Sequence, residues 1–197
     1  MYRQVFLSAL LFTLIFSACD RLSVKDNISD ESFELVNQNG ENVTFPDDYT
    51  GSTLLIGYVY TKCPDICPVI TYNMRDVYEK LGEGENIQFV SVSFDPTRDT
   101  PQILSQYAES YKIDHSNWHL LTGDRDVVDQ LLERLEIAVV KTPTRFTDDG
   151  EAVYFLDHTD RVTLIDEKGN LRRNYYGSEL NSDEVLSDIK TVMNQDN

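Results

Sequence analysis

The chain has 197 residues and carries 34 acidic against 17 basic side chains, which gives a formal net charge of −17 at neutral pH. This length is typical of one domain with a full hydrophobic core. Such acidity opposes binding to nucleic acids, whose phosphate backbone needs a basic protein face, and it opposes adsorption to anionic lipid head groups. We therefore expect no nucleic-acid partner, and any attachment to a membrane has to come from a covalent lipid.

The N-terminus has the pattern of an export signal. Arg3 is followed by an apolar run over residues 5–16, which is shorter than the about 20 residues that a membrane-spanning helix needs. Small residues then precede Cys19, as at the cleavage site of a secretory signal peptide. This stretch resembles the lipobox of bacterial lipoproteins, in which the cysteine becomes the acylated N-terminus. The alternative is that the apolar run forms a buried N-terminal helix of the fold.

The expected domain organisation follows from this N-terminus. Residues 1–18 are predicted to be a signal peptide. Cys19 is predicted to be the lipidated residue of an exported protein, anchored to the bacterial cell membrane and facing the periplasm or the cell exterior. Residues 19–32 contain few large apolar side chains, so they cannot bury enough surface to offset the entropy lost on ordering. We expect a flexible polar tether there, followed by one domain over residues 33–195.

Strands and helices alternate along the predicted domain. Two short runs flank Asn39-Gly40, a dipeptide typical of hairpin turns. A continuous apolar run at 54–60 is typical of a strand that is covered on both faces. Residues 87–94 (IQFVSVSF) are predicted to be a second buried strand. Further elements are predicted as helices at 68–81, 100–111, 124–135 and 182–193, strands at 118–121, 137–140, 162–165 and 171–176, and an inserted hairpin around Asp149-Gly150. This order predicts the α/β class with a central mixed sheet. In such sheets, ligands bind where a strand ends and a helix begins.

A pair of cysteines stands at such a position. Cys63 and Cys67 follow the strand at 54–60, and each is followed by a proline. Because the residue before a proline disfavours helical geometry, we expect Cys67 to cap the helix that begins at Pro68, with its sulfur at the positive end of the helix dipole. The residues alone leave three readings open: two inert core thiols, a dithiol–disulfide couple, or a metal site whose soft thiolates favour copper(I) or zinc.

Two thiolates leave a metal ion under-coordinated, so a third ligand has to come from the three histidines. His115 and His119 lie close to a tryptophan beside a predicted strand, and we interpret them as surface or core residues. His158 lies just before the strand at 162–165, where the chain re-enters the sheet. A lone histidine is more often structural than a ligand, so on the residues alone its role stays open.

Three motifs, in this order, resemble those of the Sco/SenC family. Residues 60–68 (YTKCPDICP) are similar to its copper motif, residues 91–101 (SVSFDPTRDTP) to its second signature, and residues 157–159 (DHT) to the motif that carries its histidine ligand. The resemblance extends over residues 33–193. It implies a thioredoxin-like fold with an N-terminal hairpin and with an inserted hairpin before the histidine.

The resemblance also implies a ligand set and a role. Cys63, Cys67 and His158 would bind one copper ion, as copper(I) or copper(II). Asp95 would orient a ligand or steer a partner, unless it only caps the following turn. The chain would deliver copper to the binuclear copper centre of cytochrome c oxidase, or reduce the cysteines that receive it. Another copper chaperone or a thiol reductant would be a further partner. Such a protein acts by ligand exchange, so we do not expect this chain to be an enzyme.

Two other functional classes remain as alternatives. A thiol–disulfide oxidoreductase or a thiol peroxidase of the same fold would use the same two cysteines, because sulfurs that share a copper ion can bond to each other after a small shift. A redox or copper sensor would use the site only to report to another protein. Loss of metal affinity without His158 would favour the carrier, whereas metal-free turnover of a thiol or peroxide would favour the enzyme.

Overall fold

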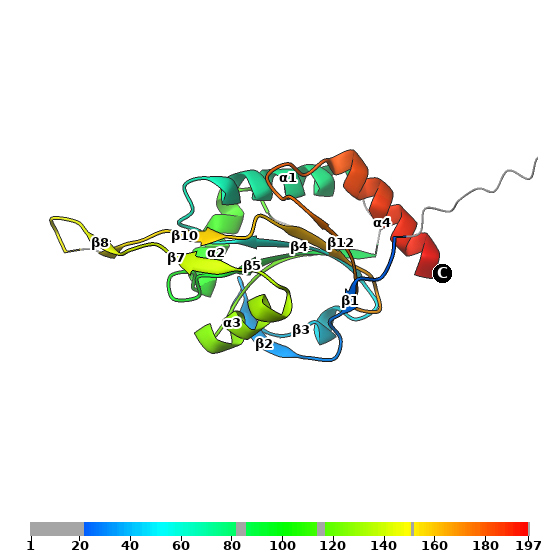
Figure 1. Cartoon of the computed structure of the whole chain (residues 1–197), viewed down its shortest axis with the longest axis horizontal. Coiled ribbons are helices and arrows are strands. Elements are labelled where there is room, and N and C mark those ends of the chain that lie inside the picture. Colours follow the sequence, from blue (N-terminus) through cyan, green and yellow to red (C-terminus); the bar gives the residue numbers. More distant parts are fainter. Residues whose placement is uncertain (1–21, 82–85, 114–116, 151, 197) are drawn as a thin grey trace, which may run out of the picture.

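The computed structural model describes residues 22–81, 86–113, 117–150 and 152–196, and it is built around an eight-stranded mixed sheet (Figure 1). In spatial order the strands are β1 Asp26–Asn27, β12 Asn170–Tyr175, β11 Val162–Ile165, β4 Thr53–Val59, β5 Ile87–Ser93, β6 Trp118–Thr122, β2 Phe33–Asn37 and β3 Asn42–Phe45. Strands β4, β5 and β6 are parallel to one another, and β11, β12 and the β2–β3 hairpin are antiparallel to their neighbours. The predicted α/β class with a central mixed sheet is confirmed.

Four α-helices and one short 3₁₀ helix complete the described fold. They are η1 Asp47–Tyr49, α1 Ile66–Leu81, α2 Pro101–Ser110, α3 Arg125–Arg134 and α4 Ser182–Asp196. Helices α1 and α4 lie side by side along one face of the sheet, and α3 lies on the opposite side (Figure 1). In the described part of the chain, no helix is both long enough and apolar enough to cross a membrane.

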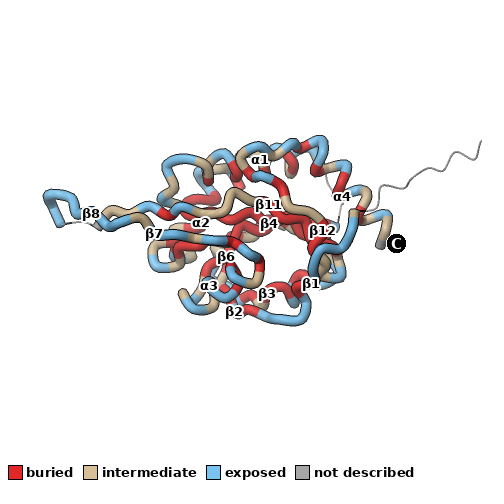
Figure 2. Tube along the Cα trace, in the orientation of Figure 1, coloured by how far each residue is buried: buried red, intermediate tan, exposed pale blue. Residues whose placement is uncertain are grey.

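The core forms where the apolar runs of the sequence become central strands. All seven residues of β4 are buried, as are all four of β11, because helices or loops cover both faces of these strands. Trp118 on β6 is fully buried and is the largest side chain of the core. Burial follows the central strands closely, whereas the outer loops are exposed (Figure 2).

Both predicted hairpins are present. The N-terminal hairpin pairs β2 with β3 and turns at Gly40, whose φ of +80° is a conformation that glycine adopts readily. The inserted hairpin pairs β8 Arg145–Phe146 with β9 Ala152–Val153 and turns near Gly150. It projects from the body as an exposed arm, at the end of the molecule away from the C-terminus of α4 (Figures 1 and 2).

The strand predicted at 137–140 occurs slightly later and lies outside the central sheet. It is β7 Val139–Lys141, which pairs only with β10 Leu156–His158 in a separate two-stranded sheet. The physical reason is the end of α3. Glu136 adopts a φ of +55°, and the Ile137 N–H donates to the Leu132 carbonyl at 2.8 Å, so Ile137 closes the helix and does not begin a strand.

The prediction of a flexible tether is wrong for residues 22–32. Strand β1 pairs with β12, and Ile28 is buried in the core. Arg134 of α3 forms ion pairs with Asp26 and with Asp30, the latter at 3.1 Å. Backbone pairing and these ion pairs add to the burial of Ile28 and order a segment with few large apolar side chains. Partners more than 100 residues away along the chain leave no trace in local composition.

Candidate metal centre

The two cysteines lie where β4 leaves the sheet and α1 begins. Helix α1 begins at Ile66, so Cys67 lies inside its first turn and not at the cap that its proline predicted. Pro68 is tolerated because the first N–H groups of a helix have no intrahelical acceptor to lose. Cys63 lies in the preceding loop, and its sulfur accepts the Cys67 N–H at 3.4 Å. The loop therefore folds back and brings both sulfurs to the start of the helix.

His158 reaches the same point from strand β10. Its Nε2 lies 3.5 Å from the Cys67 sulfur, and its Nδ1 lies 2.9 Å from the Thr159 carbonyl oxygen. Because a carbonyl only accepts, Nδ1 carries the proton, and the lone pair of Nε2 is directed at the thiols. A hydrogen bond of this kind fixes the tautomer and orientation of a histidine ligand.

Together these side chains form a potential metal site. The two sulfurs and one ring nitrogen of Cys63, Cys67 and His158 all lie within 4.8 Å of one another. They are the one group of three or more histidine, cysteine or acidic residues in the described residues that could hold a metal ion. Both cysteines are free thiols. Two thiolates and an imidazole are a donor set that suits copper or zinc, and the set leaves room for a ligand from outside.

The two thiols differ in their acidity. A hydrogen bond from Cys67 is the main cause that lowers the pKa of Cys63 to about 4. The same hydrogen bond and burial raise the pKa of Cys67. The pair loses its protons in two coupled steps, and the thiolate that forms first is on Cys63. Cys63 is half-buried and Cys67 is fully buried, so the reactive sulfur is also the accessible one.

An open cleft of about 410 Å³ gives access to Cys63 and His158. Its lining consists of Tyr60, Cys63, Pro64, Asp65, Ile66, Thr142, Phe155, Leu156, Asp157 and His158. A larger cleft of about 870 Å³ lies between α3 and β7, but it has no cysteine or histidine in its lining. The smaller cleft is therefore the one that adjoins the potential metal site.

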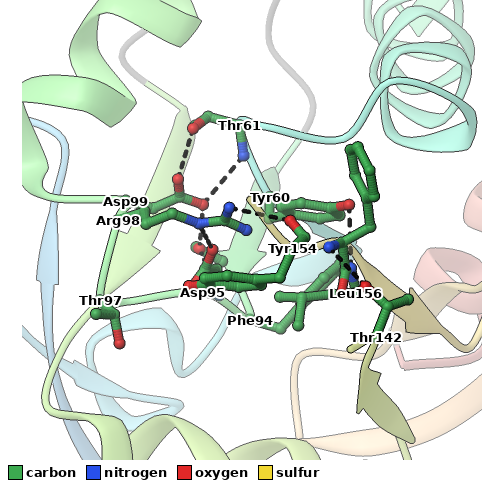
Figure 3. Close-up of polar contacts among 12 residues, drawn as sticks. Tyr60, Thr61, Phe94, Asp95, Thr97, Arg98, Asp99, Thr142, Tyr154 and Leu156 are labelled. Carbon is green, nitrogen blue, oxygen red and sulfur yellow. Dashed lines mark hydrogen bonds and ion pairs between the residues drawn. The ribbon is translucent and has the colours of Figure 1, made fainter. Parts of the chain in front are cut away.

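Asp95 lies beyond the end of β5 and does not contact the three potential ligands through any hydrogen bond or ion pair that the structure describes. Its carboxylate forms ion pairs with Arg98 and, at 3.4 Å, with Arg125, and it accepts a hydrogen bond from the Tyr154 hydroxyl at 3.3 Å (Figure 3). Arg98 in turn donates to the Tyr154 carbonyl oxygen at 3.2 Å. Asp95 thus holds an arginine beside the segment that leads into β10, and the predicted role in orienting a ligand stays a prediction.

The remaining candidates lie elsewhere. His119 is on β6, where its Nδ1 lies 2.8 Å from the Tyr49 hydroxyl, which agrees with its interpretation as a structural residue. His115 and Cys19 lie outside the described residues. Two residues that sequence reasoning did not single out, Tyr60 and Asp99, support the cysteine loop. Both stand inside the quoted motifs, which is the one signal that could have drawn attention to them.

Comparison with known proteins agrees with this geometry. The SCO1/SenC family model matches residues 23–194. ScoI of Bradyrhizobium japonicum, solved with copper bound, is 28% identical with a TM-score of 0.70, and the match covers 82% of this chain and 98% of that one. A SCO1/SenC family lipoprotein from Bacillus anthracis is 27% identical with a TM-score of 0.66, over 83% and 94% of the two chains.

A third solved structure is BsSco, described as a member of the Sco family of cytochrome c oxidase assembly proteins in which a disulfide switch was identified. It is 30% identical with a TM-score of 0.68, over 86% of this chain and 97% of that one. These matches confirm the thioredoxin-like fold. Since the matched residues include every strand of the central sheet and all but the last residues of α4, the chain belongs to the SCO1/SenC family.

Proposed function

We propose that the protein is a copper carrier, which binds one copper ion through Cys63, Cys67 and His158 and passes it to the copper-centre subunit of cytochrome c oxidase. The observation that carries this proposal is the convergence of the three ligand atoms within 4.8 Å. Two thiolates and one imidazole suit copper(I) and can also hold copper(II). The copper bound to Bradyrhizobium ScoI and the oxidase-assembly role stated for BsSco support the two halves of the proposal.

The ion is transferred by exchange of ligands. Cys63 is half-buried at the cleft, whereas Cys67 is fully buried, so an incoming thiolate of the partner displaces Cys63 first. Cys67 and His158 hold the ion until a second partner ligand arrives. Each step replaces one metal–ligand bond by another, so no covalent bond of a substrate is broken and the protein is not an enzyme. A second copper chaperone loads the site with copper, or a thiol reductant keeps its two cysteines reduced.

A second candidate function is thiol–disulfide exchange with the cysteines of the oxidase subunit. The observation in its favour is the position of the Cys63 sulfur, which is half-buried, lines the cleft and accepts the Cys67 N–H at 3.4 Å. A hydrogen bond from Cys67 lowers the pKa of Cys63 to about 4, and the thiolate is the nucleophile in such an exchange. The disulfide switch identified in BsSco supports the same chemistry. A thiol peroxidase would use the same thiolate. The carrier remains the first proposal because neither of these reactions needs the imidazole of His158 at the sulfurs.

A copper titration tests the proposed function. Each reduced domain is expected to bind about one copper ion, since it offers one complete set of soft ligands. Oxidation of Cys63 and Cys67 to a disulfide is expected to abolish tight binding, because a disulfide has no thiolate to donate. Competition with a copper(I) chelator measures both affinities, and re-reduction of the same sample is the control. Unchanged affinity after oxidation would require other ligands and would contradict the proposal.

We further propose that the mature protein is a lipoprotein, anchored through Cys19 with its domain outside the cytoplasm. The export pattern of residues 1–19 and the Bacillus anthracis relative, which is a lipoprotein, support this proposal. The wild-type protein is expected to fractionate with membranes, and Cys19→Ala is expected to abolish that partition. Cys63→Ala is the matched cysteine control and should fractionate like the wild type. Mass spectrometry of the mature N-terminus decides the matter, and an unmodified terminus upstream of Cys19 would refute the anchor.

A further inference from the structure

The three potential ligands come from two parts of the fold that no shared ladder of backbone hydrogen bonds connects. Cys63 and Cys67 follow β4 of the central sheet, whereas His158 is on β10, which pairs only with β7. The pairing of the central sheet therefore does not determine how far the imidazole lies from the sulfurs. Side-chain contacts between the two parts have to do so.

Tyr60 contacts both parts. It directly follows β4 and is 1% exposed. Its carbonyl oxygen accepts the Cys63 N–H at 3.2 Å, which holds the cysteine loop. Its hydroxyl accepts the Leu156 N–H at 3.2 Å, two residues before His158 (Figure 3). The edge-on contact of its ring with the His158 ring, at 6.4 Å between centroids and 88°, completes the connection.

The hydroxyl of Tyr60 serves a backbone group that faces away from β7. On the β7 side, the Phe155 carbonyl accepts from Thr142 N–H and the Thr159 N–H donates to Ala138. The Leu156 N–H lies on the opposite edge of β10, where the bond to Tyr60 is buried. A buried N–H without an acceptor is costly, so this bond holds β10 at one distance from the cysteine loop.

Arg98 forms a second connection beside the first. Its guanidinium donates to the Tyr154 carbonyl oxygen, and its Cζ lies 3.8 Å from the centroid of the Tyr154 ring and 5.6 Å from that of the Tyr60 ring (Figure 3). The ion pair with Asp95 fixes the arginine. The segment that enters β10 is thus held at Tyr154 by Arg98 and at Leu156 by Tyr60.

We infer that Tyr60 is a positioning residue, whose hydroxyl sets the distance between His158 and the two thiolates and so favours three-ligand over two-ligand binding of copper. This inference rests on the proposed copper-carrier function. Two thiolates alone can hold copper(I) in linear geometry, whereas copper(II) prefers more ligands and readily includes an imidazole. Loosening β10 therefore weakens the binding of copper(II) far more than that of copper(I).

The test compares two tyrosines of the same strand region. Tyr60→Phe removes only the hydroxyl that holds Leu156. Tyr58→Phe is the matched control, because Tyr58 is also fully buried and its hydroxyl donates to Thr163 at 3.1 Å, on β11 and away from the ligands. Supporting contacts around metal ligands typically change affinity by 10–100-fold, so Tyr60→Phe is expected to weaken copper(II) binding by about 10-fold and copper(I) binding by less than about threefold. Tyr58→Phe is expected to match the wild type in both.

A metal-free measurement accompanies the titration. Amide exchange at Leu156, followed by NMR on the reduced protein, is expected to accelerate in Tyr60→Phe and not in Tyr58→Phe, because the bond that protects this N–H is lost. Unchanged exchange, or equal copper(II) affinities of the two variants, would overturn the inference. His158→Ala tests the proposed ligand set separately from the role of Tyr60. If that variant keeps wild-type copper(II) binding, the proposed ligand set is wrong, whatever Tyr60 does.

Discussion

Replacement of His158 by alanine is expected to abolish stable copper(II) binding and support of oxidase assembly, while weak copper(I) binding and the fold persist. The variant keeps both thiolates, which can hold copper(I) in linear geometry, but it removes the one imidazole among the described ligand atoms. Loss of a contact that merely supports a ligand costs about 10–100-fold in affinity, so loss of the ligand itself is expected to cost at least about 100-fold for copper(II).

The measurement compares the copper(II) absorption of the variant with its circular dichroism and with oxidase activity in cells that carry it. His119→Ala is the matched histidine control, because the His119 side chain bonds to Tyr49, and neither residue belongs to the ligand group or lines the cleft beside it. It is expected to bind copper(II) like the wild type. A dithiol–disulfide couple would lose little of its exchange activity without His158. A folded His158→Ala variant with wild-type copper(II) affinity would show that the proposed ligands are wrong.

Sequence reasoning succeeded where burial alone determines the structure. The run at 54–60 contains no polar or charged side chain apart from tyrosine hydroxyls, and the run at 87–94 is largely apolar, because strands β4 and β5 are covered on both faces. It failed where distant partners decide. Strand β1 is ordered by β12 and by Arg134, and neither lies near it in the chain. The start of α1 was placed late because the restriction on a residue before proline is a bias that the first turn of a helix tolerates.

The residues of the candidate site also differ in whether the local sequence reveals them. Cys63 and Cys67 are close in sequence and carry flanking prolines, so local reasoning found them and their redox or metal chemistry. His158 is 91 residues from Cys67, and only the resemblance to a family assigned it to the same site. Tyr60 was quoted within a motif without a role, since a tyrosine at the end of an apolar strand gives no local sign that its hydroxyl holds another strand.

Asp99 is the second residue whose role the local pattern does not reveal. Among the proposed variants, replacement of Asp99 is expected to lower the free energy of unfolding the most. Its side chain is fully buried. The carboxylate accepts hydrogen bonds from the Thr61 hydroxyl at 2.5 Å, the Thr61 N–H at 3.1 Å and the Ser93 hydroxyl at 2.6 Å (Figure 3). Thr61 stands two residues before Cys63, so this carboxylate fixes the beginning of the cysteine loop to the end of β5.

Asp99→Ala leaves these three donors without their acceptor inside the protein. Each buried unsatisfied group costs about 1–3 kcal/mol, and partial relaxation recovers some of this, so we expect the free energy of unfolding to fall by about 3 kcal/mol. Because burial raises the pKa of Asp99, the neutral side chain of Asp99→Asn is expected to be tolerated better. It keeps the shape and one acceptor oxygen, and the loss should be roughly half as large.

Urea denaturation of the reduced, metal-free variants measures this effect, and copper titration of the same samples connects it to the site. Asp65→Ala is the matched control, since this aspartate lies in the cysteine loop but is exposed, and surface substitutions usually change stability by less than about 0.5 kcal/mol. Because Asp99 holds the cysteine loop and not β10, Asp99→Ala is expected to weaken copper(I) and copper(II) binding alike, unlike Tyr60→Phe or His158→Ala. A variant as stable as Asp65→Ala would mean that the Thr61 and Ser93 donors find other acceptors, and that the carboxylate does not hold the loop.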